Sequence, residues 1–402
     1  MRFDLLIALD GNGLNGFEGF AGVARLDCDI ERDRYDITVK YFDGVAGGHA
    51  TQLNPSGTVG FLGNLSQTLL FYDPRTLQEL KRFSTLRFCA PSTFYESQTH
   101  VAWLDDETFV TVLGPDFYRF RLDDLDRPQR LGAHGVTLPH ALKKSPSGRY
   151  LFYGAMDHDG RGYANEVGVF DLDAKSARVV KLPATAWHLG VHPTRDVFYA
   201  PTQRCSPQGT EFAEYTIGHF KNYLFEVDGA SAKVTRHLSI PKDLPGSLTS
   251  DVVVTEDAVL YNACASGAVV RVDLETFSKL EWVDERVGFM DTLKRLPTAW
   301  SNLLESASRA NIVGAPHVLL KALRATRFSA VDGSYGLQRS PCGHYLLSAH
   351  RGMNEVRIYR MRDFGLHRRV AFPPIQRSFP QHFGVLDDPR LGFHHTALRL
   401  PA

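Results

Sequence analysis

A strand–turn–strand unit that recurs along the chain constrains the fold more than any other feature of this sequence. In its clearest copy, two segments rich in strand-forming residues, 138–144 and 150–154, flank the turn Ser-Pro-Ser-Gly at residues 145–148. Proline fixes φ and glycine tolerates positive φ, so this tetrapeptide favours a tight turn, and the aromatic residues that follow favour a returning strand. Further copies begin at residues 49, 100, 188, 250, 335 and 382.

Repeats of roughly 40 to 50 residues with about four strands each are typical of the blades of a β-propeller. The seventh copy runs out of chain soon after residues 394–400, whereas residues 1–48 contain strand-like segments without the turn. Strands from the N-terminus would complete the last blade and leave no exposed sheet edge. The sequence therefore predicts an all-β, seven-bladed β-propeller that spans residues 1–402 as a single domain and is closed by N-terminal strands pairing with the last blade.

An insertion of helical character separates the fifth copy from the sixth. Their first residues, Ser250 and Tyr335, are 85 residues apart, whereas His140 and His188 are 48 residues apart. Within residues 286–327, apolar side chains recur at helical spacing, accompanied by several lysines and arginines. We expect a helical lid over one mouth of the ring, because loops on such scaffolds commonly cover sites. The alternative is an amphipathic segment that makes peripheral contact with a membrane or admits an apolar substrate.

The charge balance argues against a nucleic-acid partner, and the cysteine usage indicates a reducing compartment. The chain has 45 lysines and arginines against 45 acidic residues, and no basic surplus recommends a nucleic-acid partner. The five cysteines are scattered singly, as in a reduced cytosolic protein. No uninterrupted apolar run is long enough to span a bilayer, and the N-terminus, with Asp4 inside a short apolar run, is a poor signal peptide. We expect a cytoplasmic protein with a small-molecule substrate and no transmembrane segment.

One position of the repeat, at the start of the first strand, is a histidine in five of the seven copies. The chain has 16 histidines in 402 residues, so this recurrence is far above chance. In a propeller the first strand of each blade is innermost, and its early residues border the central channel. In the other two copies this position is Ser250 and Tyr335. The sequence therefore predicts a metal site on the propeller axis, with the candidate ligands His49, His100, His140, His188 and His382.

The residue type indicates the metal class. Neutral imidazole suits iron, copper, zinc or nickel, whereas Ca²⁺ and Mg²⁺ prefer oxygen ligands. Three or four histidines would leave an open position for water, O₂ or substrate, and the remaining one would act as a base or hydrogen-bond donor. Carboxylates usually orient such ligands. Four carboxylates lie on nearby strands or turns: Glu107, Asp251, Glu355 and Asp387.

Other histidines are interpreted differently. His192, His344 and His350 follow the turn or lie on outer strands, and we expect them to be structural. His394 and His395 form a second candidate pair, although adjacent residues on a strand face opposite sides of the sheet. An alternative for the whole set is that polar residues at blade starts only satisfy buried backbone groups or channel water, as in propellers without a metal.

The stretch SPCGHYLLSAHRGMNEV at residues 340–356 resembles the blade signature of the lactonase-type seven-bladed propellers. In that family serine, proline and a turn glycine precede an aromatic-aliphatic strand and then asparagine, arginine and glycine. Here His350 replaces the asparagine, while Arg351 and Gly352 remain. The resemblance covers about one blade. It implies the propeller fold, and it implies a place for Arg351 in the active site.

The ring of histidines is similar in logic to that of the carotenoid cleavage oxygenases, seven-bladed propellers in which four inner-strand histidines hold ferrous iron. The motifs around those histidines are not found here. The resemblance implies a non-haem Fe(II) oxygenase acting on an apolar or aromatic small molecule, with Tyr335 and Ser250 facing the substrate; copper, zinc and manganese are the alternative metals. Its ligands would be His49, His140, His188 and one of His100 or His382.

Two other functions stay open. In a metal-dependent lactonase, lyase or hydrolase, the metal would polarise a carbonyl or carboxylate and a free histidine would move the proton. A non-catalytic binding propeller would hold no metal and would tolerate replacement of His140. The identity of the metal separates the first two functions, since redox-active iron or copper favours the oxygenase.

Overall fold

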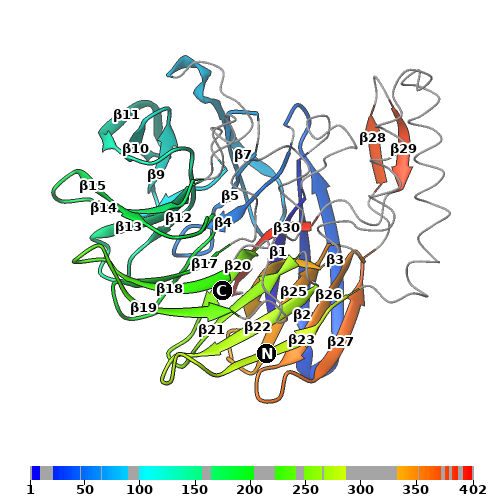
Figure 1. Ribbon diagram of the computed structural model, residues 1–402. Coiled ribbons are helices and arrows are strands. Elements are labelled where there is room, and N and C mark those ends of the chain that lie inside the picture. Colours follow the sequence, from blue (N-terminus) through cyan, green and yellow to red (C-terminus); the bar gives the residue numbers. More distant parts are fainter. Residues whose placement is uncertain are drawn as a thin grey trace, which may run out of the picture.

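The computed structural model shows a ring of small antiparallel sheets (Figure 1). The structure describes residues 2–9, 21–45, 47–64, 66–88, 99–155, 164–202, 222–240, 249–264, 267–286, 333–351, 353–372, 376–379, 383–387 and 393–400.

Six blades are four-stranded meanders whose strands follow one another in chain order. The first strand of each blade contacts the first strand of at least one neighbouring blade, which places it innermost. Blades 1 to 3 comprise β4 (Thr51–Leu53), β5 (Gly60–Leu62), β6 (Thr68–Tyr72) and β7 (Glu79–Ser84); β8 (Ala102–Trp103), β9 (Thr108–Leu113), β10 (Asp116–Arg121) and β11 (Asp124–Ala133); and β12 (Pro139–Lys144), β13 (Tyr150–Ala155), β14 (Glu166–Asp171) and β15 (Ser176–Lys181). Blades 4 to 6 comprise β16 (Gly190–Val191), β17 (Val197–Pro201), β18 (Asn222–Asp228) and β19 (Lys233–Ile240); β20 (Thr249–Val254), β21 (Ala258–Ala263), β22 (Ala268–Asp273) and β23 (Leu280–Asp284); and β24 (Ser334–Arg339), β25 (Tyr345–His350), β26 (Glu355–Arg360) and β27 (Leu366–Ala371).

The turn that defines the repeat closes as its sequence predicts. Gly57, Gly148 and Gly343 have φ values of 68°, 77° and 76°, the left-handed region that favours glycine. Each donates its backbone N–H to the carbonyl oxygen three residues earlier, at 2.8 to 2.9 Å. The shared geometry shows that blades 1, 3 and 6 are copies of one local design.

The seventh blade joins the two ends of the chain, which confirms the predicted ring closure. Its innermost strand β30 (Phe393–Arg399) pairs with β1 (Arg2–Leu9), and β2 (Gly22–Asp29) and β3 (Arg34–Tyr41) complete the sheet in the order β3-β2-β1-β30. The Arg399 guanidinium donates to the Asp4 carboxylate at 2.6 Å, and both side chains are buried. The ring therefore depends on contacts between residues nearly 400 positions apart.

The prediction that the seventh inner strand begins at residue 382 is wrong. β29 (Phe383–Asp387) pairs with β28 (Gln376–Phe379) in a separate two-stranded sheet (Figure 1). The next strand, β30, takes the innermost place because its register with β1 buries Phe393 in the core shared by blades 6 and 7. His382 lies outside the described residues.

Apolar side chains fill the spaces between adjacent blades. Every residue of β13 and of β21 is buried, as expected for strands covered on both faces by neighbouring sheets. Leu5 and Ile7 of blade 7 pack with Leu347 and Ile358 of blade 6 in one such cluster. The outermost strands, such as β27, are largely exposed.

The described residues contain two short 3₁₀ turns, η1 (Ile30–Arg32) and η2 (Thr85–Arg87), and no longer helix. The helical lid expected at residues 286–327 lies, except for Arg286, outside the described residues. No helix in the part of the chain that the structure describes is long and apolar enough to cross a membrane.

Candidate metal centre

Six histidine side chains meet where the innermost strands begin. Four come from blades 1 to 4, and two come from consecutive positions on β30. The ring centroid of His188 lies 4.6 Å from that of His395, and the ring centroid of His394 lies 4.0 Å from that of His49. Within the group, four histidines offer ligand nitrogens that all lie within 4.8 Å of one another: His49, His100, His140 and His395.

Two nitrogens of this four-histidine set face each other directly. Nε2 of His49 and Nε2 of His140 are 3.1 Å apart. Neighbouring ligand nitrogens around a single zinc ion are separated by about 3 Å, since Zn–N bonds are about 2.0–2.1 Å long. In the chain alone, one of these two rings donates its N–H to the other. The spacing thus suits both a hydrogen bond and a shared ion.

A β-bulge on β30 explains how two consecutive residues reach the same cluster. Between its pairs with Ile7 and Leu9 of β1, β30 carries one residue more than its partner, and His394 and His395 lie in this stretch. An extra residue interrupts the alternation of side chains between the two faces of a sheet. The two ring centroids are 4.7 Å apart. The expectation that adjacent residues here point apart is therefore wrong.

Two glycines let the histidine-bearing strands approach the preceding blades. A Cβ atom at Gly63 would lie 1.8 Å from the carbonyl oxygen of Thr99, and one at Gly154 would lie 2.1 Å from that of Trp187. Thr99 and Trp187 each directly precede a histidine of the cluster. Any side chain at either glycine would displace the strand that carries that histidine.

The carboxylate of Asp251 orients His395. Its Oδ1 lies 2.7 Å from Nδ1 of His395, while Oδ2 accepts hydrogen bonds from the backbone of Leu337 and the hydroxyl of Thr396. Burial raises the pKa of Asp251, but adjacent His395, the positive charge of Lys143 and the hydrogen bond from Leu337 outweigh burial and lower it overall. With the proton held on Nδ1, His395 presents a lone pair on Nε2. That Nε2 atom is buried and has no hydrogen-bond partner among the described residues.

The electrostatics of the cluster favour neutral rings. Burial, reinforced by the neighbouring imidazoles, lowers the pKa of four of the six histidines well below its usual range. Neutral imidazole is the form that binds metals, so these rings are in their ligand form at neutral pH. The four are His49, His100, His188 and His394.

The three residues expected to act beside the metal lie next to the cluster. The Tyr335 ring centroid is 4.1 Å from that of His394, and the Arg351 guanidinium carbon lies 5.6 Å from the Tyr335 ring centroid. The Ser250 hydroxyl donates to the Tyr335 carbonyl oxygen at 2.6 Å. Bulges interrupt β20 at Ser250 and β24 at Tyr335. Ser250 thus joins two blades at the site.

A cavity of about 370 Å³ extends from the histidines along the inner strands. Three of the six histidines, His100, His188 and His395, line it. Lys143 and Asp251 are the charged side chains among its lining residues in the described part of the chain. The volume is at the lower end of the range for small-molecule sites, about 300–1,000 Å³.

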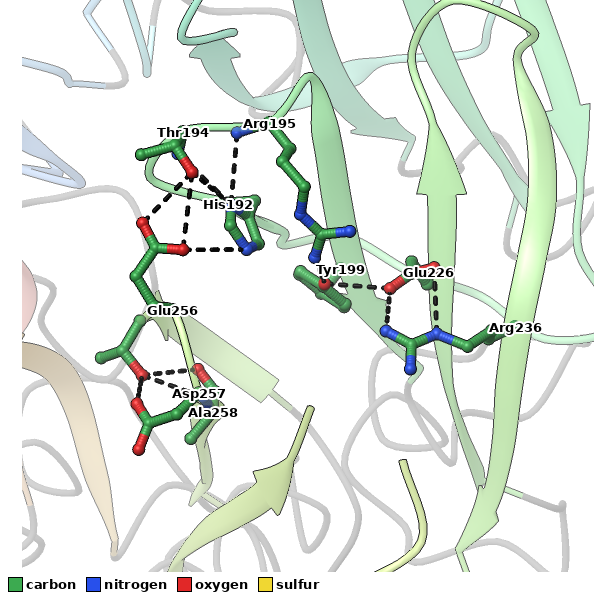
Figure 2. A network of polar contacts seen from close by, with 10 residues as sticks. His192, Thr194, Arg195, Tyr199, Glu226, Arg236, Glu256, Asp257 and Ala258 are labelled. Carbon is green, nitrogen blue, oxygen red and sulfur yellow. Dashed lines mark hydrogen bonds and ion pairs between the residues drawn. The ribbon is translucent and has the colours of Figure 1, made fainter. Parts of the chain in front are cut away.

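Histidines interpreted as structural have other surroundings. Nδ1 of His192 accepts from the backbone N–H groups of Thr194 and Arg195, both at 3.2 Å, and Nε2 lies 3.6 Å from the Glu256 carboxylate (Figure 2). His350 is buried, with Nε2 2.7 Å from the carbonyl oxygen of Glu285. These contacts tie turns and strands together away from the six rings.

Among the four carboxylates expected nearby, Asp251 contacts a ring of the cluster. Glu107 lies on an exposed turn near Arg121, and Glu355 accepts from Arg357 at 2.6 Å. The contribution of β30 was underestimated because its bulge has no signature in the histidine pair itself. Lys143 was not singled out as a site residue, because a spacing of three from His140 predicts the opposite face of a regular strand. The bulge between the two residues changes this facing.

Comparison with known proteins supports the fold. No protein-family model and no curated protein matches this sequence. The β-propeller domain of Cps50 (Swd1) from Myceliophteria thermophila is 11% identical, with a TM-score of 0.51 over 82% of this chain and 88% of that one. The dihydro-heme d1 dehydrogenase NirN, solved in complex with DHE, is 11% identical, with a TM-score of 0.52 over 98% of this chain and 74% of that one. At such identities the likeness shows the fold alone.

Proposed function

We propose that the four-histidine set binds a redox-active transition metal, Fe(II) in the first place, and that the protein is an oxygenase acting on a small molecule in the axial cavity. The observation that carries this proposal is the convergence of four ligand nitrogens within 4.8 Å of one another from four different blades. Imidazole ligands suit iron, copper and zinc. When bound, such a metal would supply redox chemistry and a site for O₂.

The donor set fits an ion because one of its atoms is otherwise unsatisfied. Nε2 of His395 is buried without a partner among the described residues, although Asp251 holds the other side of the ring. A buried polar atom without a hydrogen bond costs about 1–3 kcal/mol, and a ligand would remove this cost. A carboxylate that fixes the tautomer of a histidine is the usual support of a metal ligand.

The remaining residues have distinct roles in this proposal. His188 lies beside the four-histidine set and lines the cavity, so it is placed to accept a proton from a bound molecule. Ser250 positions Tyr335 by donating a hydrogen bond from its hydroxyl to the Tyr335 carbonyl oxygen. Arg351 lies against the ring of Tyr335. The cavity lining includes Lys143, Asp251, Gln52 and other polar groups. A polar substrate therefore suits it better than the apolar or aromatic one expected from sequence.

The second candidate, a metal-dependent lactonase, lyase or hydrolase, is favoured by the position of His188. The His188 ring centroid lies 4.8 Å from that of His140, and His188 lines the cavity, so a water or substrate bound in the cavity can donate a hydrogen bond to this ring. Burial lowers the pKa of His188 well below its usual range, which keeps the ring neutral. In this case the metal would be zinc or manganese, acting as a Lewis acid. NirN is described as a dihydro-heme d1 dehydrogenase. A haem brings its own four nitrogens and takes axial ligands from the protein, so four converging imidazoles favour a non-haem ion here.

Elemental analysis of full-length protein purified without a His-tag tests the proposal. We expect about one iron per chain, and the double variant His140→Ala/His395→Ala should lose it. The matched control is His192→Ala, which removes a buried histidine whose contacts lie elsewhere and should retain the metal. One zinc or manganese per chain, lost in the same double variant, would favour the second candidate.

Less than about half a metal per chain after reconstitution with Fe(II), unchanged in the double variant, would contradict both functions. That result would favour a non-catalytic binding propeller. Circular dichroism of each variant separates loss of a ligand from loss of the fold.

A further inference from the structure

Lys143 is the cation that lines the axial cavity among the described residues, and it has no salt bridge there. Its ammonium makes no hydrogen bond and no ion pair with any residue that the structure describes. By contrast, Lys144, the next residue, donates to the carbonyl oxygen of Leu104 at 2.7 Å. Lys143 is half-buried, and without such a contact its ammonium has three N–H donors available to a ligand in the cavity.

The backbone directs Lys143 toward the same channel as His140. Lys143 is the third residue after His140, an odd spacing that would place the two on opposite faces of a regular strand. β12 has a bulge between them: His140 pairs with Gly154 and Lys143 with Phe152, so two residues of β12 lie opposite one residue of β13. Ala141, within the bulge, has a φ of 53°. Bulges re-aim side chains and are common next to active sites.

The other charged group of the cavity is already engaged. Asp251 accepts hydrogen bonds from His395, Leu337 and Thr396, and it forms no ion pair with Lys143. Among the neutral polar groups, Gln52 uses both ends of its amide on the backbone of Val101, at 2.7 Å each. Asp251 is also a counter-charge of Lys143, because the positive charge of Lys143 contributes to the lowered pKa of Asp251. No hydrogen bond joins the two side chains among the described residues, so the Lys143 ammonium keeps its N–H groups for a ligand.

We propose that Lys143 binds the carboxylate of a small anionic substrate, with the rest of the molecule reaching toward the histidines. A single ammonium, with no arginine among the described residues that line the cavity, suits one carboxylate better than a phosphate. Proteins usually hold a phosphate with arginines, several backbone N–H groups or a helix N-terminus. The volume of about 370 Å³ limits the substrate to a small molecule. This inference deepens the proposed function and rests on it, since it names the substrate class of the same site.

Affinities for propionate and for propionamide, two molecules of nearly equal size, test the inference by ligand-observed NMR titration. Wild-type protein should bind propionate more tightly than propionamide by about tenfold to a hundredfold, the range of a charge-assisted hydrogen bond. Lys143→Met and Lys143→Gln should both abolish this preference. Lys144→Met is the matched control and should keep it, because Lys144 is engaged by Leu104.

Three results would overturn the inference. Equal binding of the two molecules by wild-type protein would show that no carboxylate site exists. A preference that persists in both Lys143 variants would assign the carboxylate to another group, such as a bound metal. Inorganic phosphate binding more tightly than propionate, and only with Lys143 present, would assign the site to phosphate. The metal content of each sample is measured in parallel, so a metal-free protein that still prefers propionate would contradict the proposed function and not this site.

Discussion

His395 and His192 are buried histidines that each lie beside a carboxylate, but their second ring nitrogens face different surroundings. Nδ1 of His395 meets Asp251 at 2.7 Å, and its Nε2 is unpartnered among the described residues. His192 is held at Nδ1 by two backbone N–H groups, and its Nε2 approaches the largely exposed Glu256 (Figure 2). One ring lies among five others, and the second lies in the turn between β16 and β17.

Burial and a carboxylate partner are common to His395 and His192, whereas convergence with other rings distinguishes His395. Both side chains are buried, His192 at 2% and His395 at 4% relative exposure. A carboxylate partner is also common to both. The difference is convergence, since the His395 ring centroid lies 5.0 Å from that of His49 and 5.4 Å from that of His100. Convergence of neutral donors, and not burial, is what a metal requires.

The largest expected effect concerns pH. In the chain prepared without metal, the pKa values of four cluster histidines are depressed by burial, whereas unfolded histidines titrate near 6.5. Below pH 6.5 the unfolded chain binds protons that the folded chain does not, so the free energy of unfolding falls as pH falls and is fully retained above this range. Each such histidine contributes up to about 1.4 kcal/mol per pH unit.

Urea unfolding of metal-free protein at pH 7.5, 6.5 and 5.5 measures this dependence, and we expect a loss of several kcal/mol. His394→Leu removes one buried ring and should make the dependence shallower by up to about 1.4 kcal/mol per pH unit. A free energy of unfolding that stays level between pH 7.5 and 5.5 would break the comparison, because the cluster would then bind protons as readily as unfolded histidines do.

The sequence predicted the ring and most members of the histidine cluster because both follow from a repeat. Turn glycines such as Gly148 recur at fixed offsets, and the histidine at the start of each first strand falls in the same structural place. His49, His100 and His140 were therefore found by alignment alone. Asp251 was named among four carboxylates, although spacing could not choose it, because its contact with His395 joins residues 144 positions apart.

The rest depended on local irregularities that a repeat cannot predict. His395 and Lys143 reach the channel through bulges on β30 and β12. An extra residue in a strand moves every later side chain to the other face of the sheet. His382 was chosen because an Asp-Asp-Pro turn follows it. The innermost strand of blade 7 instead begins at Phe393, where pairing with β1 closes the ring. The innermost strand of blade 7 is therefore determined by its long-range pairing with β1 and not by the turn that follows residue 382.

The second prediction sharpens the comparison at the carboxylate. Asp251→Asn removes the charge that fixes the His395 tautomer, and we expect metal affinity to fall by about tenfold to a hundredfold, as is typical when such support is lost. Competition with a chromogenic chelator measures the affinity. Glu355→Gln is the matched control: Glu355 is buried but pairs with Arg357 at 2.6 Å, so the variant should unfold more easily yet bind the metal normally. Equal metal affinity in wild type and Asp251→Asn would show that His395 needs no orienting charge.

The smallest effect is expected at the carboxylate beside His192. The Glu256 side chain is 63% exposed, and burial keeps the pKa of His192 low, so the contact pairs a solvated carboxylate with a neutral ring. Glu256→Gln should therefore lower the free energy of unfolding by less than about 1 kcal/mol, as measured by urea unfolding at neutral pH. Much of this contact is kept, since the amide that replaces the carboxylate can still meet the Thr194 hydroxyl, which now donates to Glu256 at 3.1 Å. The metal content of Glu256→Gln should equal that of wild type, because the backbone N–H groups of Thr194 and Arg195 hold His192 without this carboxylate. Loss of metal in Glu256→Gln would mean that the two histidines belong to one connected network, and convergence at the channel would no longer distinguish them.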